Sequence, residues 1–283
     1  MECWPIRLEY GGYLALVELS VHTAAMKVFR MSLIVLCFLS LIARSASADA
    51  PLSDPAATKL VEEAIEYWRE KTSQTVASMT IHRPEWERSM KMKSWTKGLD
   101  LSLIKFIGPP KDAGSASLKI ANEMWSYSPK INRVIKIPSS MMAQSWMGSD
   151  FSYNDLARDN DIIEHYHHQF LPEETHEGRK VFVVLAIPKE DAPVVWGKEI
   201  VKVRDDKVLL EHLFFDQEMK LVKAFKTISI ADFGGKIFPK TMRMTNVEKE
   251  DEWTEITHHS ITFGIELPEN LFTISYLKNP RLQ

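Results

Sequence analysis

The sequence contains only two cysteines, Cys3 and Cys37, and both precede the point at which we expect the chain to be cleaved. A mature chain without them excludes structural disulfides, thiolate metal sites and a thiol nucleophile. A large excess of one charge is also missing, because 35 basic residues stand against 38 acidic ones, a formal net charge of −3. This balance argues against a general nucleic-acid footprint, so we expect no nucleic-acid partner. We find no internal repeat, no low-complexity tract and no linker that would split the chain.

The N-terminal region has the parts of a secretory signal. A short basic start, Met26–Arg30, precedes an apolar run, Ser32–Ile42, that is too short to span a bilayer comfortably. Ala46-Ser47-Ala48 has the small-x-small form of a cleavage site, so we expect export and a cut after Ala48. An uncleaved anchor or a buried helix is the alternative. Residues 1–48, an upstream extension plus signal peptide, would then be removed, and residues 49–283 would form a single domain.

One helix is expected at the start of the mature domain. Asp54 can cap it, and Pro55 suits its first position because the missing N–H has no intrahelical partner there. The apolar side chains that recur at helical spacing are Leu60, Val61, Ala64, Ile65 and Trp68. This face should lie on something hydrophobic, and Val181–Ile187, apolar on both faces, is a strand that the helix could cover.

Almost everything after this helix is expected to be β-strand. Between Trp86 and Ser94 the residues on the two faces differ in polarity, as in a sheet with one side in water. The other expected strands are Val76–His82, Leu101–Ile107, Ala116–Ala121, Met124–Tyr127, Val134–Ile137, Ile162–Leu171, Lys180–Ile187, Val194–Arg204, Val208–Phe215, Lys220–Ile228, Thr241–Val247 and Trp253–Phe263. Short strands joined by tight turns favour one curled antiparallel sheet. We therefore expect a mainly β fold of the α+β class, an incomplete, half-open β-barrel covered by the leading helix and a short helical lid.

The segment from Met124 to Leu156 carries the most information. It reads MWSYSPKINRVIKIPSSMMAQSWMGSDFSYNDL, in which two short strands precede a connection rich in methionine and aromatic residues. The order W-x-Y-x-P-K, then R, then M-G-S-D-F-x-x-x-D-L resembles the outer-membrane lipoprotein-sorting protein family, of the LolA/LolB-like superfamily of periplasmic carriers. The matching positions are Trp125, Tyr127, Pro129, Lys130, Arg133, Met147, Gly148, Ser149, Asp150, Phe151, Asp155 and Leu156. Three later stretches, Lys220–Phe225, Pro239–Met244 and Asn270–Thr273, also fit the family pattern.

The resemblance favours a lid, Met141–Phe151, over the open mouth of the barrel, within a stopper segment of residues 139–157. Methionine can repack around ligands of differing shape, and an acyl chain gains about 0.8 kcal/mol per buried CH₂. The side chains expected to line the lid and cavity are Trp125, Tyr127, Met141, Met142, Trp146, Met147 and Phe151. The alternative is that these side chains plug a closed core.

Polar residues of the same segment have more than one interpretation. Arg133, with Lys130, can hold the head group of a lipid, or it can be a surface charge that keeps a β edge from aggregating. The structural motif of the segment comprises Gly148, Ser149, Asp150 and Asp155. Ser149 or Asp150 can cap a short helix over Tyr153–Ala157. No G-x-S-x-G elbow surrounds Ser149, so position rather than catalysis explains this serine.

The histidines allow an alternative function of a different class. We expect His165 and His167 on one strand face, and His258 and His259 lie in a late strand. Alternate histidines on one strand, completed by a third from another, can ligate a metal and could make the protein a metal-dependent hydrolase. A solvated polar face explains the same pattern, and we expect neither a metal nor another cofactor.

The resemblance as a whole implies a monomeric, non-enzymatic periplasmic carrier. Its ligand would be lipoprotein acyl chains or lipid, bound in the barrel cavity and handed toward the outer membrane. Because relatives are associated with exporters of the resistance-nodulation-division (RND) type, an inner-membrane exporter is an implied partner. A lipid-responsive sensor or adaptor for such an exporter is the alternative.

Overall fold

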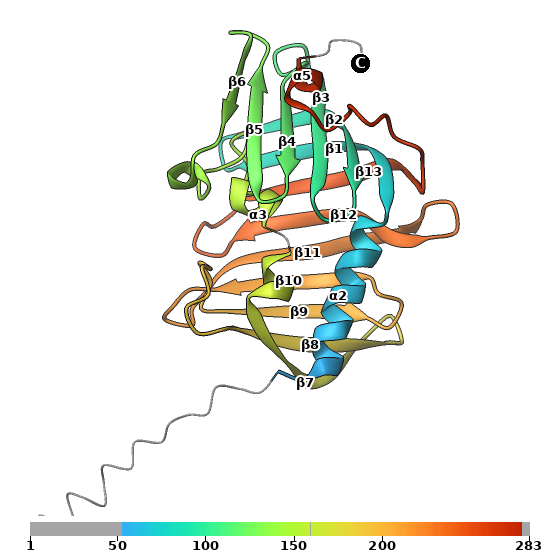
Figure 1. The fold of residues 1–283 in the computed structure, drawn as a ribbon. Coiled ribbons are helices and arrows are strands. Elements are labelled where there is room, and N and C mark those ends of the chain that lie inside the picture. The colour runs from blue at the N-terminus through green and yellow to red at the C-terminus, as the bar shows by residue number, and fades with distance from the viewer. Residues whose placement is uncertain (1–52, 159, 279–283) are drawn as a thin grey trace, which may run out of the picture. The chain divides into compact units, whose positions relative to one another are not determined.

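One long antiparallel sheet curls around a helix in the computed structural model, which describes residues 53–158 and 160–278 (Figure 1). The expected signal peptide and the cleavage site after Ala48 lie outside the described residues. Residues 51–283 make one compact unit. Within the described part of the chain, no helix is both long enough and apolar enough to cross a membrane.

Thirteen strands of the described residues form the sheet. They are β1 (Thr72–Arg83), β2 (Trp86–Lys97), β3 (Leu101–Gly108), β4 (Ala116–Ile120), β5 (Glu123–Ser128), β6 (Arg133–Lys136), β7 (Tyr166–His176), β8 (Arg179–Pro188), β9 (Lys198–Arg204), β10 (Leu209–Phe215), β11 (Leu221–Asp232), β12 (Ile237–Asn246) and β13 (Trp253–Phe263). Their order is β6-β5-β4-β3-β2-β1-β13-β12-β11-β10-β9-β8-β7, so β6 and β7 are the two ends and the sheet does not close. The expected half-open, mainly β fold is confirmed.

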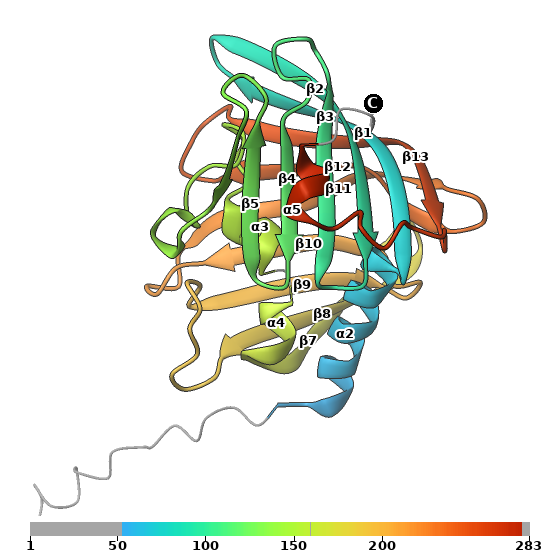
Figure 2. The same cartoon turned by 45° about the horizontal axis from the view of Figure 1, so that its top comes forward.

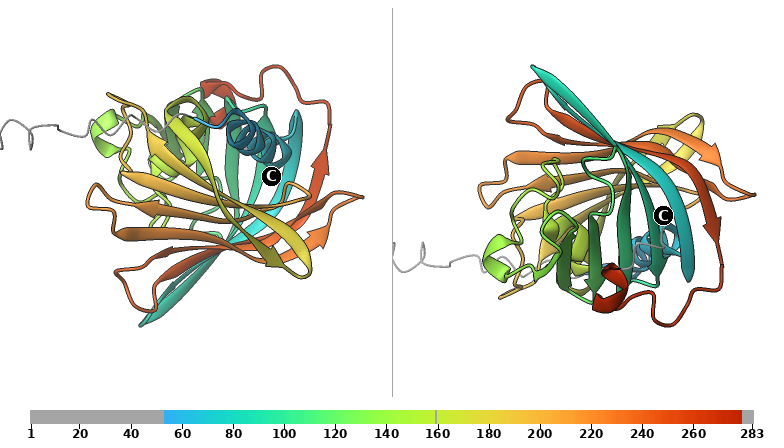
Figure 3. Two further views of the ribbon diagram at one scale, coloured as in Figure 1. Left: turned by 90° about the horizontal axis from the view of Figure 1, so that it is seen from below. Right: turned by 90° about the horizontal axis from the view of Figure 1, so that it is seen from above.

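The sheet curls because several of its ladders contain irregularities. The register shifts in β1 at Val76/Ala77, in β2 at Lys91/Met92 and in β11 at two places after Thr227. A β-bulge bends its strand and increases the local twist, which lets a long sheet wrap around a core. Figure 3 shows the resulting curl from below and from above, with the helix on the concave side.

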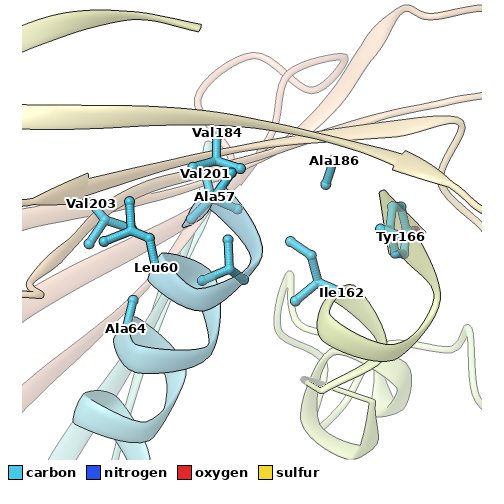
Figure 4. Packing of buried hydrophobic residues seen from close by; sticks show 10 residues of the cluster. Ala57, Leu60, Ala64, Ile162, Tyr166, Val184, Ala186, Val201 and Val203 are labelled. Carbon is cyan, nitrogen blue, oxygen red and sulfur yellow. The ribbon is translucent and has the colours of Figure 1, made fainter. Parts of the chain in front are cut away.

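The leading helix, α2 (Pro55–Arg69), is capped as expected, because the Asp54 carboxylate accepts a hydrogen bond from Ala56 N at 2.8 Å. Its buried side chains Leu60 and Ala64 pack against Val184 of β8 and Val201 of β9 (Figure 4). Full burial of a leucine of this kind contributes about 1.5–3 kcal/mol. The helix therefore supplies the cover that the doubly apolar strand needs.

The outer face of β2–β5 is covered by the C-terminal segment, which we did not expect. Leu271 and Phe272, with Leu277 of α5 (Ile274–Leu277), pack on Leu118 and Trp125. Figure 2 shows α5 lying over this end of the sheet. The outer face of this part of the sheet is thus covered, and its inner face, where Ser117 and Lys119 lie beside Ile104 and Met124, is left for the cavity.

Two expected strands begin too early: β9 starts at Lys198 rather than at Val194, and the strand expected from Ile162 also starts later. Residues Asp161–Glu164 form the short helix α4, and strand β7 starts only at Tyr166. A helical turn is favoured here because Asn160 accepts backbone bonds from Ile163 and Glu164, and Ile162 then packs into the cluster under α2. His165 ends this helix, so it does not share a strand face with His167.

Candidate functional site

A cavity of about 430 Å³ lies between the concave face of the sheet and α2. Its lining comes from α2, from the inner faces of β3–β5 and β9–β13, from the 139–158 segment and from the loop at residues 193–196. Apolar side chains dominate the lining, among them Ile65, Trp68, Ile104, Phe214, Phe225 and Met244. Ligand pockets typically have volumes of about 300–1,000 Å³ and an apolar lining of this kind.

One part of the predicted lid lines the cavity, and another part is buried in the core. Met142 and Phe151 line the cavity, so this part of the segment forms one of its walls. Trp146 is instead fully buried, and its Nε1 donates a hydrogen bond to Ser117 Oγ at 2.9 Å. Its ring lies 5.5 Å from that of Phe106, in a cluster against which Met147 also packs. Both interpretations of the segment thus apply, each to a different part of it.

Several of the expected ligand-binding side chains lie elsewhere. Trp125 and Tyr127 belong to the outer face of the sheet, where they pack in the cluster under the C-terminal segment. Met141, in the short 3₁₀ helix η1 (Ser139–Met141), is exposed. Lys130 and Arg133 are also exposed, near the β5–β6 turn. None of these five lines the cavity.

Ser149 and Asp150 hold the lid rather than cap a helix. The buried Ser149 hydroxyl donates to Trp146 O at 2.7 Å and accepts a hydrogen bond from Phe151 N at 3.2 Å. Gly148, just before it, has a φ of +79°, a backbone conformation that glycine adopts without strain. Asp150 forms a two-pronged ion pair with Arg83 of β1, with contacts of 3.0 and 3.1 Å.

The helix expected at Tyr153–Ala157 is confirmed as α3, but its expected cap is wrong. Ser152 is the cap: its hydroxyl accepts a hydrogen bond from Asp155 N, and the Asp155 side chain accepts one from Ser152 N. This reciprocal box satisfies two donors that Ser149 and Asp150 are too far upstream to reach. Asp155 also lines the cavity and pairs with Lys223 of β11 at 2.5 Å, which ties α3 to the sheet.

A polar wall of the cavity was not predicted. It consists of five side chains: Arg158, Asp161, Tyr166, Glu199 and His212. Glu199 is 4% exposed, and it contacts His212 Nε2. Burial raises the pKa of Tyr166 and that of Asp161. Apart from Arg158 and Asp161, which are three residues apart, the residues come from separate elements, so no sequence spacing connects them.

The histidines do not make the proposed metal site. Strands β7 and β13, which carry His167 and His258, are separated in the sheet by five others. His258 Nδ1 donates a hydrogen bond to Pro239 O at 2.8 Å, and burial lowers the pKa of this histidine. Among the described residues, no group of three or more metal-binding side chains comes together.

A family model described as an uncharacterized protein matches residues 98–279. A crystallised outer-membrane lipoprotein-sorting protein domain from Vibrio parahaemolyticus is 25% identical, with a TM-score of 0.69 over 79% of this chain and 99% of that one. A DUF1329 family protein from Desulfovibrio piger is 24% identical, with a TM-score of 0.71 over 78% and 98%. A LolA superfamily protein from Nitrosomonas europaea is 20% identical, with a TM-score of 0.64 over 78% and 98%. No curated protein matches the chain.

Proposed function

The chain belongs to the family matched over residues 98–279, and it has the fold of outer-membrane lipoprotein-sorting and LolA-superfamily proteins. From this family and fold we propose that the protein is a non-enzymatic carrier of a hydrophobic ligand. The ligand, an acyl chain of a lipid or lipoprotein, binds in the cavity under α2. The observation that carries this proposal is the cavity itself, a mainly apolar space between α2 and the concave face of a well-packed sheet.

The physical case rests on the cost of leaving such a space empty. Beside the apolar part of the lining, with side chains such as Trp68, Phe225 and Met244, water finds few hydrogen-bond partners. An acyl chain gains about 0.8 kcal/mol for each CH₂ that leaves water, so a ligand with a long chain needs no catalytic group to bind tightly.

The place and partners of this carrier are part of the proposal. The basic start, the apolar run and the Ala46-Ser47-Ala48 sequence direct export, and the periplasm is where a lipid would need a carrier between two membranes. An RND-type exporter of the inner membrane would then be a donor or acceptor of the ligand, and transfer would run toward the outer membrane.

A substitution that fills the cavity tests the proposal. Ile104→Trp on β3 adds bulk into the cavity, while Ile135→Trp makes the same change on β6, where the side chain is 49% exposed. Native mass spectrometry of residues 49–283 purified from the periplasm should show a co-purifying acyl species in the wild type and in Ile135→Trp. The mass difference should be absent from Ile104→Trp.

The same proteins should be titrated with the fluorescent apolar probe 1-N-phenylnaphthylamine. We expect Ile104→Trp to weaken probe binding by about tenfold or more, because the bulky ring occupies the binding space. Equal binding by all three proteins, or no uptake of any apolar molecule by the wild type, would contradict the carrier proposal. If the wild type takes up no apolar molecule, the sensor or adaptor becomes the better explanation, and binding to an exporter would test it.

A further inference from the structure

The polar wall of the cavity is a connected set of side chains. Glu199 on β9 and His212 on β10 come from neighbouring strands and contact each other through His212 Nε2. Tyr166, at the start of β7, lines the cavity beside them, and burial together with the charge of Glu199 raises the pKa of its hydroxyl. Asp161, one helical turn earlier, completes the wall with Arg158, whose Nη1 lies 3.5 Å from Asp161 Oδ2. An apolar cavity with polar groups on one side is suited to an amphiphile.

The ionisable side chains of this wall contact one another in pairs. Arg158 stands against Asp161, and the Glu199 carboxylate contacts His212 Nε2. Outside the wall, the lining carboxylate of Asp155 is paired with Lys223. The two other cations of the lining, Arg69 and Lys119, have partners of their own in the chain. A ligand with an ionic head would add an uncompensated charge to a space of low dielectric constant, which is costly.

The wall nevertheless has hydrogen-bonding capacity that its internal contacts do not use. Of the Arg158 guanidinium, Nη1 faces Asp161 Oδ2 at 3.5 Å, and the group has five N–H donors in all. An ionised carboxylate can accept about four hydrogen bonds, and the contact with His212 occupies Oε2 of Glu199. A hydroxyl or amide group donates and accepts at once, so it can use both kinds of unused capacity.

We propose that the cavity binds a single-chain amphiphile with an uncharged head that carries both a hydrogen-bond donor and an acceptor, and that Arg158, Asp161, Glu199 and His212 receive this head. The inference rests on the proposed carrier function and narrows its ligand class. The cavity volume of about 430 Å³ is in the lower half of the usual range of roughly 300–1,000 Å³. It therefore suits one chain better than the several chains of a lipoprotein anchor.

Four molecules with the same chain length and different heads test this assignment. Monopalmitoylglycerol, palmitate, hexadecylammonium and dipalmitoyl phosphatidylglycerol would each compete for bound 1-N-phenylnaphthylamine on the mature wild-type protein, below the critical micelle concentration of each single-chain competitor. We expect monopalmitoylglycerol to bind about tenfold more tightly than either charged single-chain molecule, because a buried charge without a partner is unfavourable. The two-chain lipid should compete least.

Two variants should change this selectivity in opposite directions. Asp161→Asn leaves the Arg158 guanidinium uncompensated and should shift preference toward palmitate by about tenfold. Arg158→Gln leaves the Asp161 carboxylate uncompensated and should shift preference toward hexadecylammonium. Asp205→Asn removes a carboxylate from an exposed pair with Arg179, outside the lining, and should leave the order of affinities unchanged. Asp161→Asn leaves the more exposed partner, Arg158, without its ion pair, so this variant should fold even if Arg158→Gln does not.

The outcomes separate this inference from the carrier function. If all four molecules displace the probe with equal affinity, the carrier proposal stands and the polar wall is not a head-group site. Tighter binding of palmitate or hexadecylammonium to the wild type would overturn the uncharged head, and tighter binding of the two-chain lipid would overturn the single chain. If none of the molecules binds, the carrier proposal itself fails.

Discussion

Replacement of Asp150 by asparagine should destabilise the protein more than any other single polar change in the lid. The Asp150 side chain is 4% exposed and receives two hydrogen bonds from Arg83 and one from the Thr254 hydroxyl, the last at 2.6 Å. Asp150 N in turn donates to Thr254 Oγ1 at 3.0 Å. One side chain thus fixes the lid to β1 and β13 at once.

The expected magnitude follows from these contacts. Breaking a buried ion pair costs about 3–5 kcal/mol, because the remaining charge is left without compensation. Here Glu252 lies 3.3 Å from Arg83 Nε and keeps part of that compensation. Asparagine also keeps one carbonyl oxygen that can accept a hydrogen bond from Arg83 or Thr254. We therefore expect Asp150→Asn to lower the free energy of unfolding by about 2–3 kcal/mol, at the lower limit of the buried-pair range.

Urea denaturation followed by tryptophan fluorescence measures this loss. Combining Asp150→Asn with Arg83→Met in a double-mutant cycle should give a coupling energy of about 1–3 kcal/mol. The matched control is Asp205→Asn, whose exposed pair with Arg179 should be worth less than about 1 kcal/mol. A loss below about 0.5 kcal/mol for Asp150→Asn, or a coupling energy near zero, would refute the assignment of Asp150 as the anchor of the lid.

Two further changes test the local structure. Ser152→Ala should lower the free energy of unfolding by about 1 kcal/mol, because the α3 cap is lost. If substitution of Asp150 alone lowered the local stability of α3 by the same amount, Asp150 rather than Ser152 would be the cap. Burial lowers the pKa of His168, so its stabilising effect is present above about pH 6.5 and is lost as the pH falls through the folded-state pKa. The urea midpoint should therefore fall less between about pH 7.5 and about pH 5 in His168→Asn than in the wild type. The raised pKa of Asp161 changes stability with pH in the opposite direction, but it does so equally in both proteins. If the urea midpoint changed with pH identically in both proteins, His168 would have the same pKa in the folded and unfolded states.

The strands could be predicted because period-two alternation is a local signal. Met90 and Met92 are buried on one face of β2, while Glu87 and Lys91 of the other face are exposed, as their alternation indicates. The strand prediction at Ile162 was wrong because it relied on local signals alone. Two adjacent isoleucines favour a strand on local grounds, but packing under α2 favours a helical turn.

The candidate site was harder to predict because it depends on which face of the sheet is the inner one. Trp125 and Met124 are neighbours, and both are buried, but only Met124 lines the cavity. Trp125 faces the C-terminal segment, whose position is set by contacts more than a hundred residues away in sequence. The polar wall has a similar difficulty: Glu199 and His212 come together across the neighbouring strands β9 and β10, but Asp161 reaches the same cavity from α4, a helix outside the sheet.

The cavity persists because two separate clusters hold its sides apart. On one side of the cavity, α2 packs on β8 and β9 through Leu60. On the other side, Trp146 packs on Phe106 of β3. Collapse of the space between them would require one cluster to break, since close-packed interiors do not deform gradually. The lid is part of the second cluster, so Trp146 and Asp150 determine whether the cavity exists, while Met142 and Phe151 determine what fits in it. Variants of the first kind should lose stability and binding together. Met142 and Phe151 are also buried in packed clusters, so variants of the second kind should lose more binding than their loss of stability explains.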